Sequence, residues 1–259
     1  MSLLARLQSL KDSGEKIAML TCYDASMATL MAQAGVDVLL VGDSLGMVLQ
    51  GGRDTLGVTM ADMCYHTDCV AAGAPDLPII TDLPYGSDNT PDLALENAQQ
   101  LLAAGAHMVK LEGNKSDIVR LLTQHGIAVC GHLGFTPQSV HELGGYKVQG
   151  RDAAGAQKIL DDALALQQAG ISLLVLEMVP AQLAARITQS LNIPTIGIGA
   201  GPDCSGQVLV VHDALGMYPG KTLRFTRNFL QATGSIPAAL LAYVAAVKAR
   251  EFPAPEHCF

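Results

Sequence analysis

Ionisable and hydroxyl side chains follow the short apolar runs of this chain, each at the point where a run ends. They are Asp24, Asp43 with Ser44, Asp82, Lys110 with Glu112, His132, Glu177, and His212 with Asp213. So many acids around one cleft would raise one another's pKa unless a cation lay among them. Oxygen ligands without Cys or His at zinc spacing favour Mg2+, with Mn2+ as the second candidate.

This set of groups suits one kind of chemistry. A Mg2+ held by a few carboxylates keeps open positions, which a 2-oxo acid fills with its carboxylate and keto oxygens. Chelation of that kind stabilises an enolate, and a carboxylate across the cleft would remove the α-proton. Lys110 would neutralise the substrate carboxylate or the developing oxyanion. The residue types therefore predict enolisation of a 2-oxo acid.

Four of these residues also have simpler interpretations. Asp43 could only cap the element that follows it. Lys110 and Glu112 are two positions apart, so they share one face of a strand, and a structural ion pair between them is the alternative to a catalytic role. His132 is equally a substrate contact or an ordinary histidine whose hydrogen bonds are satisfied.

The apolar runs that position these groups predict eight buried strands. The runs are Ile17–Asp24, Val36–Val41, Leu77–Pro84, His107–Gly113, Ile127–Gly134, Ser172–Met178, Pro194–Gly201 and Gln207–Val211. Helices are expected between many of them, at Met1–Ser13, Ala25–Ala34, Thr59–Ala72, Thr90–Gly105, Ala153–Ala169, Ala181–Leu191 and Asn228–Glu251. This alternation predicts an α/β fold, a single-domain (β/α)8 TIM barrel over residues 1–259 with a short N-terminal helix and C-terminal helices.

Two glycine-containing stretches lie at the ends of expected strands. Gln50–Gly57 is too irregular to pack as an element, so it is a candidate lid. Gly197, Gly199 and Gly201 lack the spacing of a dinucleotide loop, and we expect them to allow close backbone packing or close approach of a ligand.

Composition sets limits on the partners. The chain has 259 residues, 49% of them hydrophobic and only 15% charged, which indicates much buried surface and favours a homo-oligomer. The net charge of −8 provides no basic surface for nucleic acid or acidic membranes. No apolar segment approaches the roughly 20 residues of a membrane helix, and the N-terminus lacks a signal-peptide layout, so we expect a cytoplasmic protein. The six cysteines are scattered, and we expect free thiols that are mostly buried.

Six segments in register give the chain a specific resemblance. They are Val41–Met47, Asp82–Pro84, Val109–Gly113, Gly131–Gln138, Gly144–Arg151 and Gly197–Gly201. Together they resemble the ketopantoate hydroxymethyltransferase family, and the likeness runs from about Leu3 to the C-terminus. The resemblance implies transfer of a hydroxymethyl group from 5,10-methylenetetrahydrofolate to 3-methyl-2-oxobutanoate, which forms 2-dehydropantoate in pantothenate biosynthesis.

The resemblance also implies roles for particular residues. Mg2+ would be bound by Asp43 and Asp82, with Glu112 near or on the metal. The substrate would be held by Ser44 and Lys110, and His132 would line the site. Glu177 would be the base that takes the C3 proton, and the enolate would attack the one-carbon unit of the folate, as an iminium. The family is commonly a decamer of two pentameric rings.

Three departures from the family pattern lie away from the proposed ligands. Gly57 stands where proline is usual, Asp88 where an aromatic or small residue is usual, and Ser205 where an aspartate is expected. The first would loosen the candidate lid, and the second would alter the folate side of the cleft.

Two other functions compete with this interpretation. Another Mg2+-dependent aldolase or lyase of a 2-oxo acid, similar to phosphoenolpyruvate mutase or isocitrate lyase, would share the metal and the enolate but need no folate. A catalytically silent barrel kept for assembly would lack metal ligands, whereas every expected ligand is present here.

Overall fold

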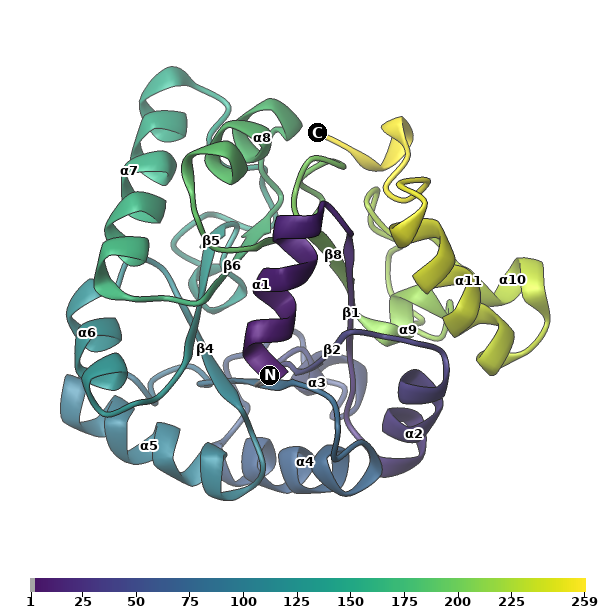
Figure 1. Cartoon of the computed structure of the whole chain (residues 1–259), viewed down its shortest axis with the longest axis horizontal. Coiled ribbons are helices and arrows are strands. Elements are labelled where there is room, and N and C mark those ends of the chain that lie inside the picture. Colours follow the sequence, from purple (N-terminus) through teal and green to yellow (C-terminus); the bar gives the residue numbers. More distant parts are fainter. Residues whose placement is uncertain (1–2) are drawn as a thin grey trace.

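The computed structural model describes residues 3–259 and has a barrel of eight parallel strands at its centre (Figure 1). Each strand pairs with the next in chain order, and β8 closes the barrel against β1. The strands are β1 (Ile17–Thr21), β2 (Val38–Val41), β3 (Ile79–Asp82), β4 (Met108–Glu112), β5 (Val129–Gly134), β6 (Leu173–Glu177), β7 (Thr195–Ile198) and β8 (Gly206–Leu209). The predicted single-domain (β/α)8 barrel is confirmed.

Helices cover the barrel, most of them on its outer face and α1 across one end. They are α1 (Leu3–Ser13), α2 (Ala25–Gln33), α3 (Leu45–Val48), α4 (Met60–Gly73), α5 (Pro91–Ala103), α6 (Ser116–Gln124), α7 (Ala153–Ala169), α8 (Ala181–Ser190), α9 (Val211–Ala214), α10 (Leu230–Thr233) and α11 (Ile236–Lys248). Short 3-10 turns occupy Pro137–Ser139 and Pro255–His257. The predicted N-terminal helix is confirmed over Leu3–Ser13, and its first two residues lie outside the described part of the chain.

The structure adds three helices that the sequence analysis did not predict. α6 packs beside β5, and Ile118, Val119 and Leu122 form its buried stripe. The other two, α3 and α9, are single turns that directly follow β2 and β8. Residues 199–205 contain no helix, so β7 and β8 are joined by an irregular segment.

Local sequence explains where several helices begin and end. Thr59 caps α4 in a reciprocal arrangement with Asp62, and Thr90 caps α5 ahead of Pro91. Gly170 ends α7 with φ of 108°, a backbone conformation that favours glycine.

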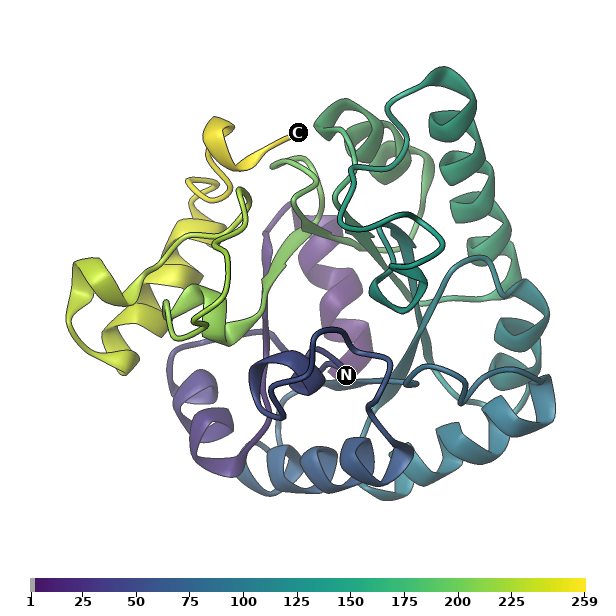
Figure 2. The same cartoon turned by 180° about the vertical axis from the view of Figure 1, so that it is seen from behind.

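α1 covers the amino-terminal end of the barrel, where it crosses the centre of Figure 1. Lys11 Nζ donates to the main-chain oxygens of Leu191 and Ile193, at 2.6 and 2.8 Å, just ahead of β7. Figure 2 shows the opposite face, where the segments that follow β2, β5 and α9 lie around the opening. Chemistry at the carboxyl ends of the strands is therefore reached from the face in Figure 2.

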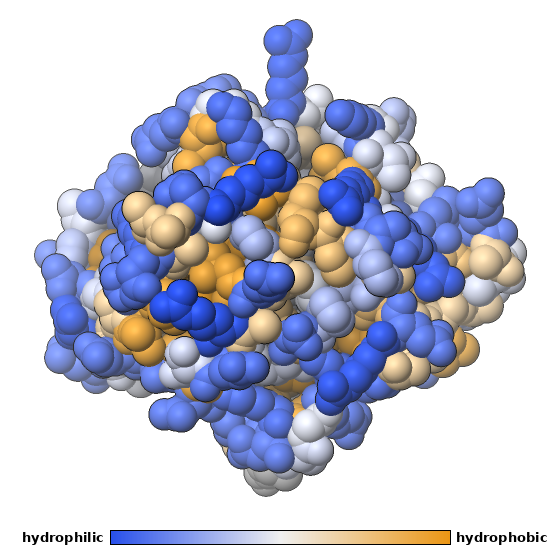
Figure 3. All heavy atoms as spheres, turned by 90° about the horizontal axis from the view of Figure 1, so that it is seen from above, coloured by the Kyte–Doolittle hydropathy of each residue, from blue (hydrophilic) through white to orange (hydrophobic). Residues whose placement is uncertain are grey.

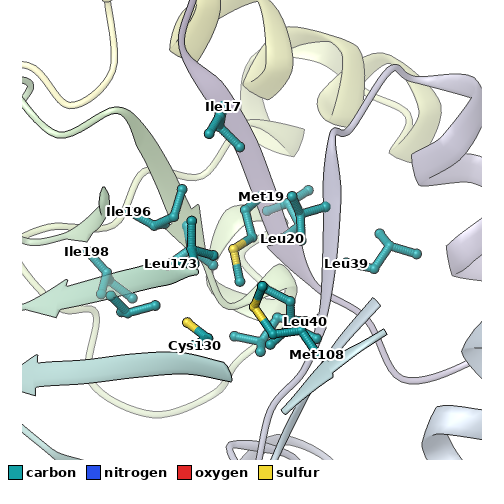
Figure 4. Close-up of a cluster of buried hydrophobic side chains, with 14 of the residues drawn as sticks. Ile17, Met19, Leu20, Leu39, Leu40, Met108, Cys130, Leu173, Ile196 and Ile198 are labelled. Atoms are coloured by element: carbon teal, nitrogen blue, oxygen red, sulfur yellow. The ribbon is translucent and has the colours of Figure 1, made fainter. Parts of the chain in front are cut away.

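Alternate residues of each strand point into the barrel. The side chains inside it change from apolar to polar toward the carboxyl ends of the strands. Near the starts of the strands, the interior is filled by Met108, Cys130, Leu173 and other apolar side chains, as Figure 4 shows. On β4, the residues two and four positions after Met108 are Lys110 and Glu112. The apolar layers thus support a polar layer at the carboxyl ends of the strands.

The outer surface is mostly hydrophilic, with apolar areas between the polar side chains on the side shown in Figure 3. No helix within residues 3–259 is long and apolar enough to cross a membrane. All six cysteines are free, as predicted; Cys22, Cys130 and Cys204 are buried, whereas the other three are partly exposed.

Candidate active site

Seven predicted site residues line one cavity at the carboxyl ends of the strands. They are Asp43, Ser44, Asp82, Lys110, Glu112, His132 and Glu177. The cavity has an empty volume of about 890 Å3, which includes the open space at its mouth. Strands β2 to β6 supply these groups in chain order because their carboxyl ends meet at the same end of the barrel.

Lys110 forms an ion pair with Asp82 on the neighbouring strand. Its Nζ lies 2.8 Å from Asp82 Oδ1, because Asp82 on β3 and Lys110 on β4 are register partners. Burial opposes the charge on Lys110, but the carboxylates of Asp82, Glu112 and Asp43 outweigh that effect and raise its pKa. The structural ion pair that was the alternative for Lys110 is present, with Asp82 and not Glu112 as partner, and both side chains still line the cavity.

His132 lies between two carboxylates. Its Nδ1 is 3.3 Å from Glu112 Oε1 and its Nε2 is 3.3 Å from Glu177 Oε2. Burial and the charge of Lys110 lower the pKa of His132, but Glu112 and Glu177 outweigh them and raise it to about 9. The same contact, with Lys110, lowers the pKa of Glu112 against the effect of burial. His132 therefore lies within ion-pair distance of both acids, and Lys110 Nζ approaches its Nδ1 at 3.4 Å.

Gln138 connects three parts of the site, and the sequence analysis assigned it no role. Its main-chain N–H donates to Glu112 Oε2 at 3.0 Å. Its side-chain amide donates to Asp43 Oδ2 and to the main-chain oxygen of Leu83, both at 2.9 Å. Gln138 belongs to a segment that supports the family resemblance, but nothing in its residue type indicates a contact with two carboxylates.

The carboxylates of Asp43, Asp82 and Glu112 are the type of oxygen ligand that a hard divalent cation takes. Burial, followed by the charges of Asp82 and Glu112, raises the pKa of Asp43 well above its usual range. Oδ1 of Asp82 is buried and accepts no well-directed hydrogen bond, although Lys110 lies close to it. No three His, Cys, Asp or Glu side chains within residues 3–259 form a ready-made metal cluster. Mg2+ usually takes one or two carboxylates and completes its shell with water and substrate.

Ser44 follows Asp43 at the start of α3. Its Oγ lies 2.9 Å from the hydroxyl of Tyr23, which follows β1. The main-chain N–H of Asp43 donates to Asp82 Oδ2 at 3.0 Å, which ties the turn after β2 to the end of β3. The interpretation of Asp43 as a simple helix cap is wrong, because its carboxylate bonds to Gln138 across the barrel.

Other expectations need correction. Asp24 does not line the cavity; its carboxylate caps α2 by accepting from Met27 N. His212 lies on α9 and lines a second, smaller cavity, because the chain turns into a helix directly after β8. Asp88 is buried against Lys115 at 2.6 Å and lines neither cavity, and its effect on the folate side of the cleft stays a prediction.

The structure bears on the glycine prediction at Gly201, on Ser205 and on the candidate lid. A side chain at Gly201 would lie 2.5 Å from Ala181 Cβ, so close packing explains this glycine. Ser205 exchanges hydrogen bonds with Thr195 at 3.2 Å, a structural role. The Gln50–Gly57 segment is irregular and brings Thr55 to the cavity. There is open space around Gly57, and its closure as a lid stays a prediction.

Comparisons with known proteins identify close relatives. A family model described as ketopantoate hydroxymethyltransferase matches residues 2–255. A 3-methyl-2-oxobutanoate hydroxymethyltransferase of Methylobacillus flagellatus is 60% identical over 259 residues, covering 99% of both chains. The protein of the same name from Azoarcus sp. (strain BH72) is 58% identical, covering 99% of this chain and 96% of the relative.

Solved structures of more distant proteins share the barrel. Phosphonopyruvate hydrolase matches with a TM-score of 0.65 at 14% identity, covering 83% of this chain and 84% of that one. A 2,3-dimethylmalate lyase matches with a TM-score of 0.61 at 17% identity, covering 83% of each chain. At such low identity these structures show a common fold only.

Proposed function

The chain belongs to the ketopantoate hydroxymethyltransferase family, and from that premise we propose how the residues of the cavity perform the family reaction. The protein transfers a hydroxymethyl group to 3-methyl-2-oxobutanoate and forms 2-dehydropantoate, a step of pantothenate biosynthesis. The alternative of an aldolase or lyase for another 2-oxo acid rests only on a shared fold at 14–17% identity. The observation that supports the proposal most strongly is the gathering of all seven predicted site residues in one cavity.

Asp43 and Asp82 would hold the metal, Mg2+ in this proposal. When bound, that ion would polarise the keto group of the substrate and stabilise the enolate. Gln138 restrains both Asp43 and Glu112, so Glu112 is kept within the same polar layer. The raised pKa of Asp43 reflects negative charge that a divalent cation would offset.

Lys110 and Ser44 would position the oxo acid. Lys110 is a buried cation, so it attracts the substrate carboxylate without competition from bulk water. The hydroxyl of Ser44 is oriented by Tyr23 and remains on the cavity wall. Two fixed contacts of this kind would present C3 of the substrate toward the opposite side of the barrel.

Glu177 would be the base that removes the C3 proton. Its carboxylate is 13% exposed and lies at the end of β6, so it can reach a ligand in the cavity. His132 contributes positive charge 3.3 Å from that carboxylate. Proton transfer from C3 to Glu177 would leave the enolate, and C3 would then form a bond to the methylene carbon of 5,10-methylenetetrahydrofolate. Both bonds from that carbon to the folate nitrogens break and a water molecule supplies the hydroxyl oxygen. The protons from C3 and from water pass to the two nitrogens, which releases tetrahydrofolate together with 2-dehydropantoate.

Product formation tests this proposal. The purified protein is mixed with 3-methyl-2-oxobutanoate, 5,10-methylenetetrahydrofolate and Mg2+, and 2-dehydropantoate is followed by NMR. We expect product only when all three are present, and loss of product after chelation with EDTA. Pyruvate in place of 3-methyl-2-oxobutanoate is the matched control. Equal turnover of pyruvate, or product formation without folate, would contradict the proposal.

Assembly and location are part of the same proposal. Several large apolar side chains are about half exposed in the single chain: Leu49, Tyr65, Tyr85, Met217 and Leu241. Their burial between subunits would fit a homo-oligomer, with the family's decamer as the expected size. Six free cysteines suit the reducing conditions of the cytoplasm. Sedimentation velocity would measure the subunit number, and a monomer at micromolar concentration would contradict the assembly.

A further inference from the structure

A second cavity opens beside the first, lined by α9 and by the segment that follows it. Its empty volume is about 460 Å3, and its polar lining includes His212, Asp213, Tyr218, Thr222, Thr226 and Asn228. Asp213 and Tyr218 line both cavities, so the two spaces adjoin at these side chains. The catalytic chemistry described above uses none of the groups in this second cavity.

Asp213 lies where the two cavities adjoin, and its carboxylate has no role in the chemistry described above. Its carboxylate has no hydrogen bond or ion pair with any part of residues 3–259. Burial raises the pKa of Asp213 to about 6. A carboxylate that is largely removed from water and has no donor is unfavourable for folding, and such groups are commonly satisfied by a ligand.

The neighbouring polar groups leave further hydrogen-bonding capacity. His212 Nδ1 is buried without a partner, and burial lowers the pKa of His212, so the ring is neutral at neutral pH. Thr226 Oγ1 donates to Leu223 O, which leaves its lone pairs free to accept. No Lys or Arg lines this cavity, so it suits an uncharged polar ligand edge better than a phosphate or carboxylate.

Part of the wall of the first cavity, which Asp213 also lines, is apolar. It includes Val210, Leu223 and Phe225, and Glu177 lines the same cavity. A ligand that contacts the Asp213 carboxylate therefore needs two N–H donors side by side on one edge. The rest of the ligand should be flat and should tolerate apolar neighbours. The pterin ring of a tetrahydrofolate has this form, because its N3–H and 2-amino group lie side by side on one edge.

Resting on the proposed function, we propose that Asp213 binds the pterin edge of 5,10-methylenetetrahydrofolate. The carboxylate accepts one hydrogen bond from N3–H and one from the 2-amino group, in the bidentate manner of carboxylate and guanidinium. The second cavity takes the polar edge of the ring, and the reactive side of the folate faces the cavity that contains Glu177. Asp213 is thus a binding residue for the co-substrate.

The first test uses the unmodified protein. Isothermal titration measures the Kd of tetrahydrofolate and of its 2-desamino-2-methyl analogue, which keeps the ring but lacks the amino donor. We expect the analogue to bind about 10-fold to 100-fold more weakly, the usual effect of losing a hydrogen bond to a charged group in a closed site. Equal Kd values would overturn the proposal.

The second test compares Asp213→Asn with Asp76→Asn, an exposed aspartate that lines neither cavity. We expect Asp213→Asn to weaken tetrahydrofolate about 10-fold to 100-fold and to lose most of its discrimination against the analogue. A Kd within twofold of the unmodified protein, or equal loss of affinity for both ligands, would overturn it. If the unmodified protein forms no 2-dehydropantoate at all, the proposed function itself fails, which is a separate outcome.

Discussion

Gln138 offers the sharpest prediction about how the site is held together. Gln138→Leu keeps the main-chain N–H that donates to Glu112 but removes the side-chain amide that donates to Asp43 and Leu83 O. A hydrogen bond to a charged group contributes about 1.5–3 kcal/mol and a neutral one about 0.5–1.5 kcal/mol. The sum is a loss of roughly 2–4 kcal/mol, which for a chain of this size lowers Tm by roughly 5–15 °C.

Gln138→Leu should also raise the Mg2+ requirement of the protein. Residues that hydrogen-bond a metal ligand typically affect metal affinity by about 10-fold to 100-fold. We therefore expect the Mg2+ concentration for half-maximal product formation to rise by about that factor in Gln138→Leu. Thermal unfolding in EDTA and a Mg2+ titration of the rate are the two assays.

Gln149→Leu is the matched control. Gln149 lies in the same connection after β5, and its amide donates only to the main-chain oxygen of Lys147 at the surface. Surface changes of this kind are usually within about 0.5 kcal/mol. If Gln138→Leu behaved like the control in both assays, the bridge between Asp43 and Glu112 would have no energetic role and the reasoning would be refuted.

The other variants test the charges of the site one at a time. Asp82→Asn removes a proposed metal ligand, so the Mg2+ requirement should rise more than 100-fold; an unchanged titration would exclude Asp82 from that role. Lys110→Met leaves Asp82 buried without its cation, which should lower stability by about 3–5 kcal/mol in metal-free buffer, and an unchanged Tm would refute the pairing. Asp213→Asn should raise Tm at neutral pH. The folded-state pKa of Asp213, about 6, lies above the roughly 3.9 of an unfolded aspartate, so the ionised group lowers stability as pH rises from about 4 to 6. The Tm advantage of Asp213→Asn should therefore grow over that range, on the order of 1–2 kcal/mol after allowing for solvent contact, and a pH-independent difference would contradict the burial of an unpartnered carboxylate.

The sequence was sufficient to predict the barrel and the ring of polar groups because both depend on a repeated local pattern. Each apolar run specifies a buried strand, and the residue after it must leave the core at the carboxyl end. Asp43, Asp82 and Glu177 follow that rule. Asp24 and His212 follow their runs in the same way, but each lies in or caps a helix that turns its side chain from the cavity.

Pairing across strands could not be predicted from the sequence. Lys110 and Glu112 are neighbours on one face of β4, so the sequence suggested a pair between them. The register of β3 and β4 instead places Asp82 beside Lys110, while Glu112 pairs with His132 on β5. Register depends on the closure of the whole barrel, which no single segment encodes.

Gln138 was missed for a related reason. One of its three contacts uses the main-chain N–H, which every residue except proline has, and the other two reach residues far away in the chain. α6 was missed although Ile118, Val119 and Leu122 have helical spacing, because the segment between the fourth and fifth strands was assigned no element.

Exchange of the C3 proton of 3-methyl-2-oxobutanoate in D2O, followed by NMR without folate, tests the central claim most directly. The unmodified protein with Mg2+ should exchange this proton, and EDTA should stop the exchange. Glu177→Gln should still bind the oxo acid but slow exchange by about 100-fold to 10,000-fold, the usual contribution of a general base. Exchange at the unmodified rate in Glu177→Gln would contradict the assignment of Glu177 as the base.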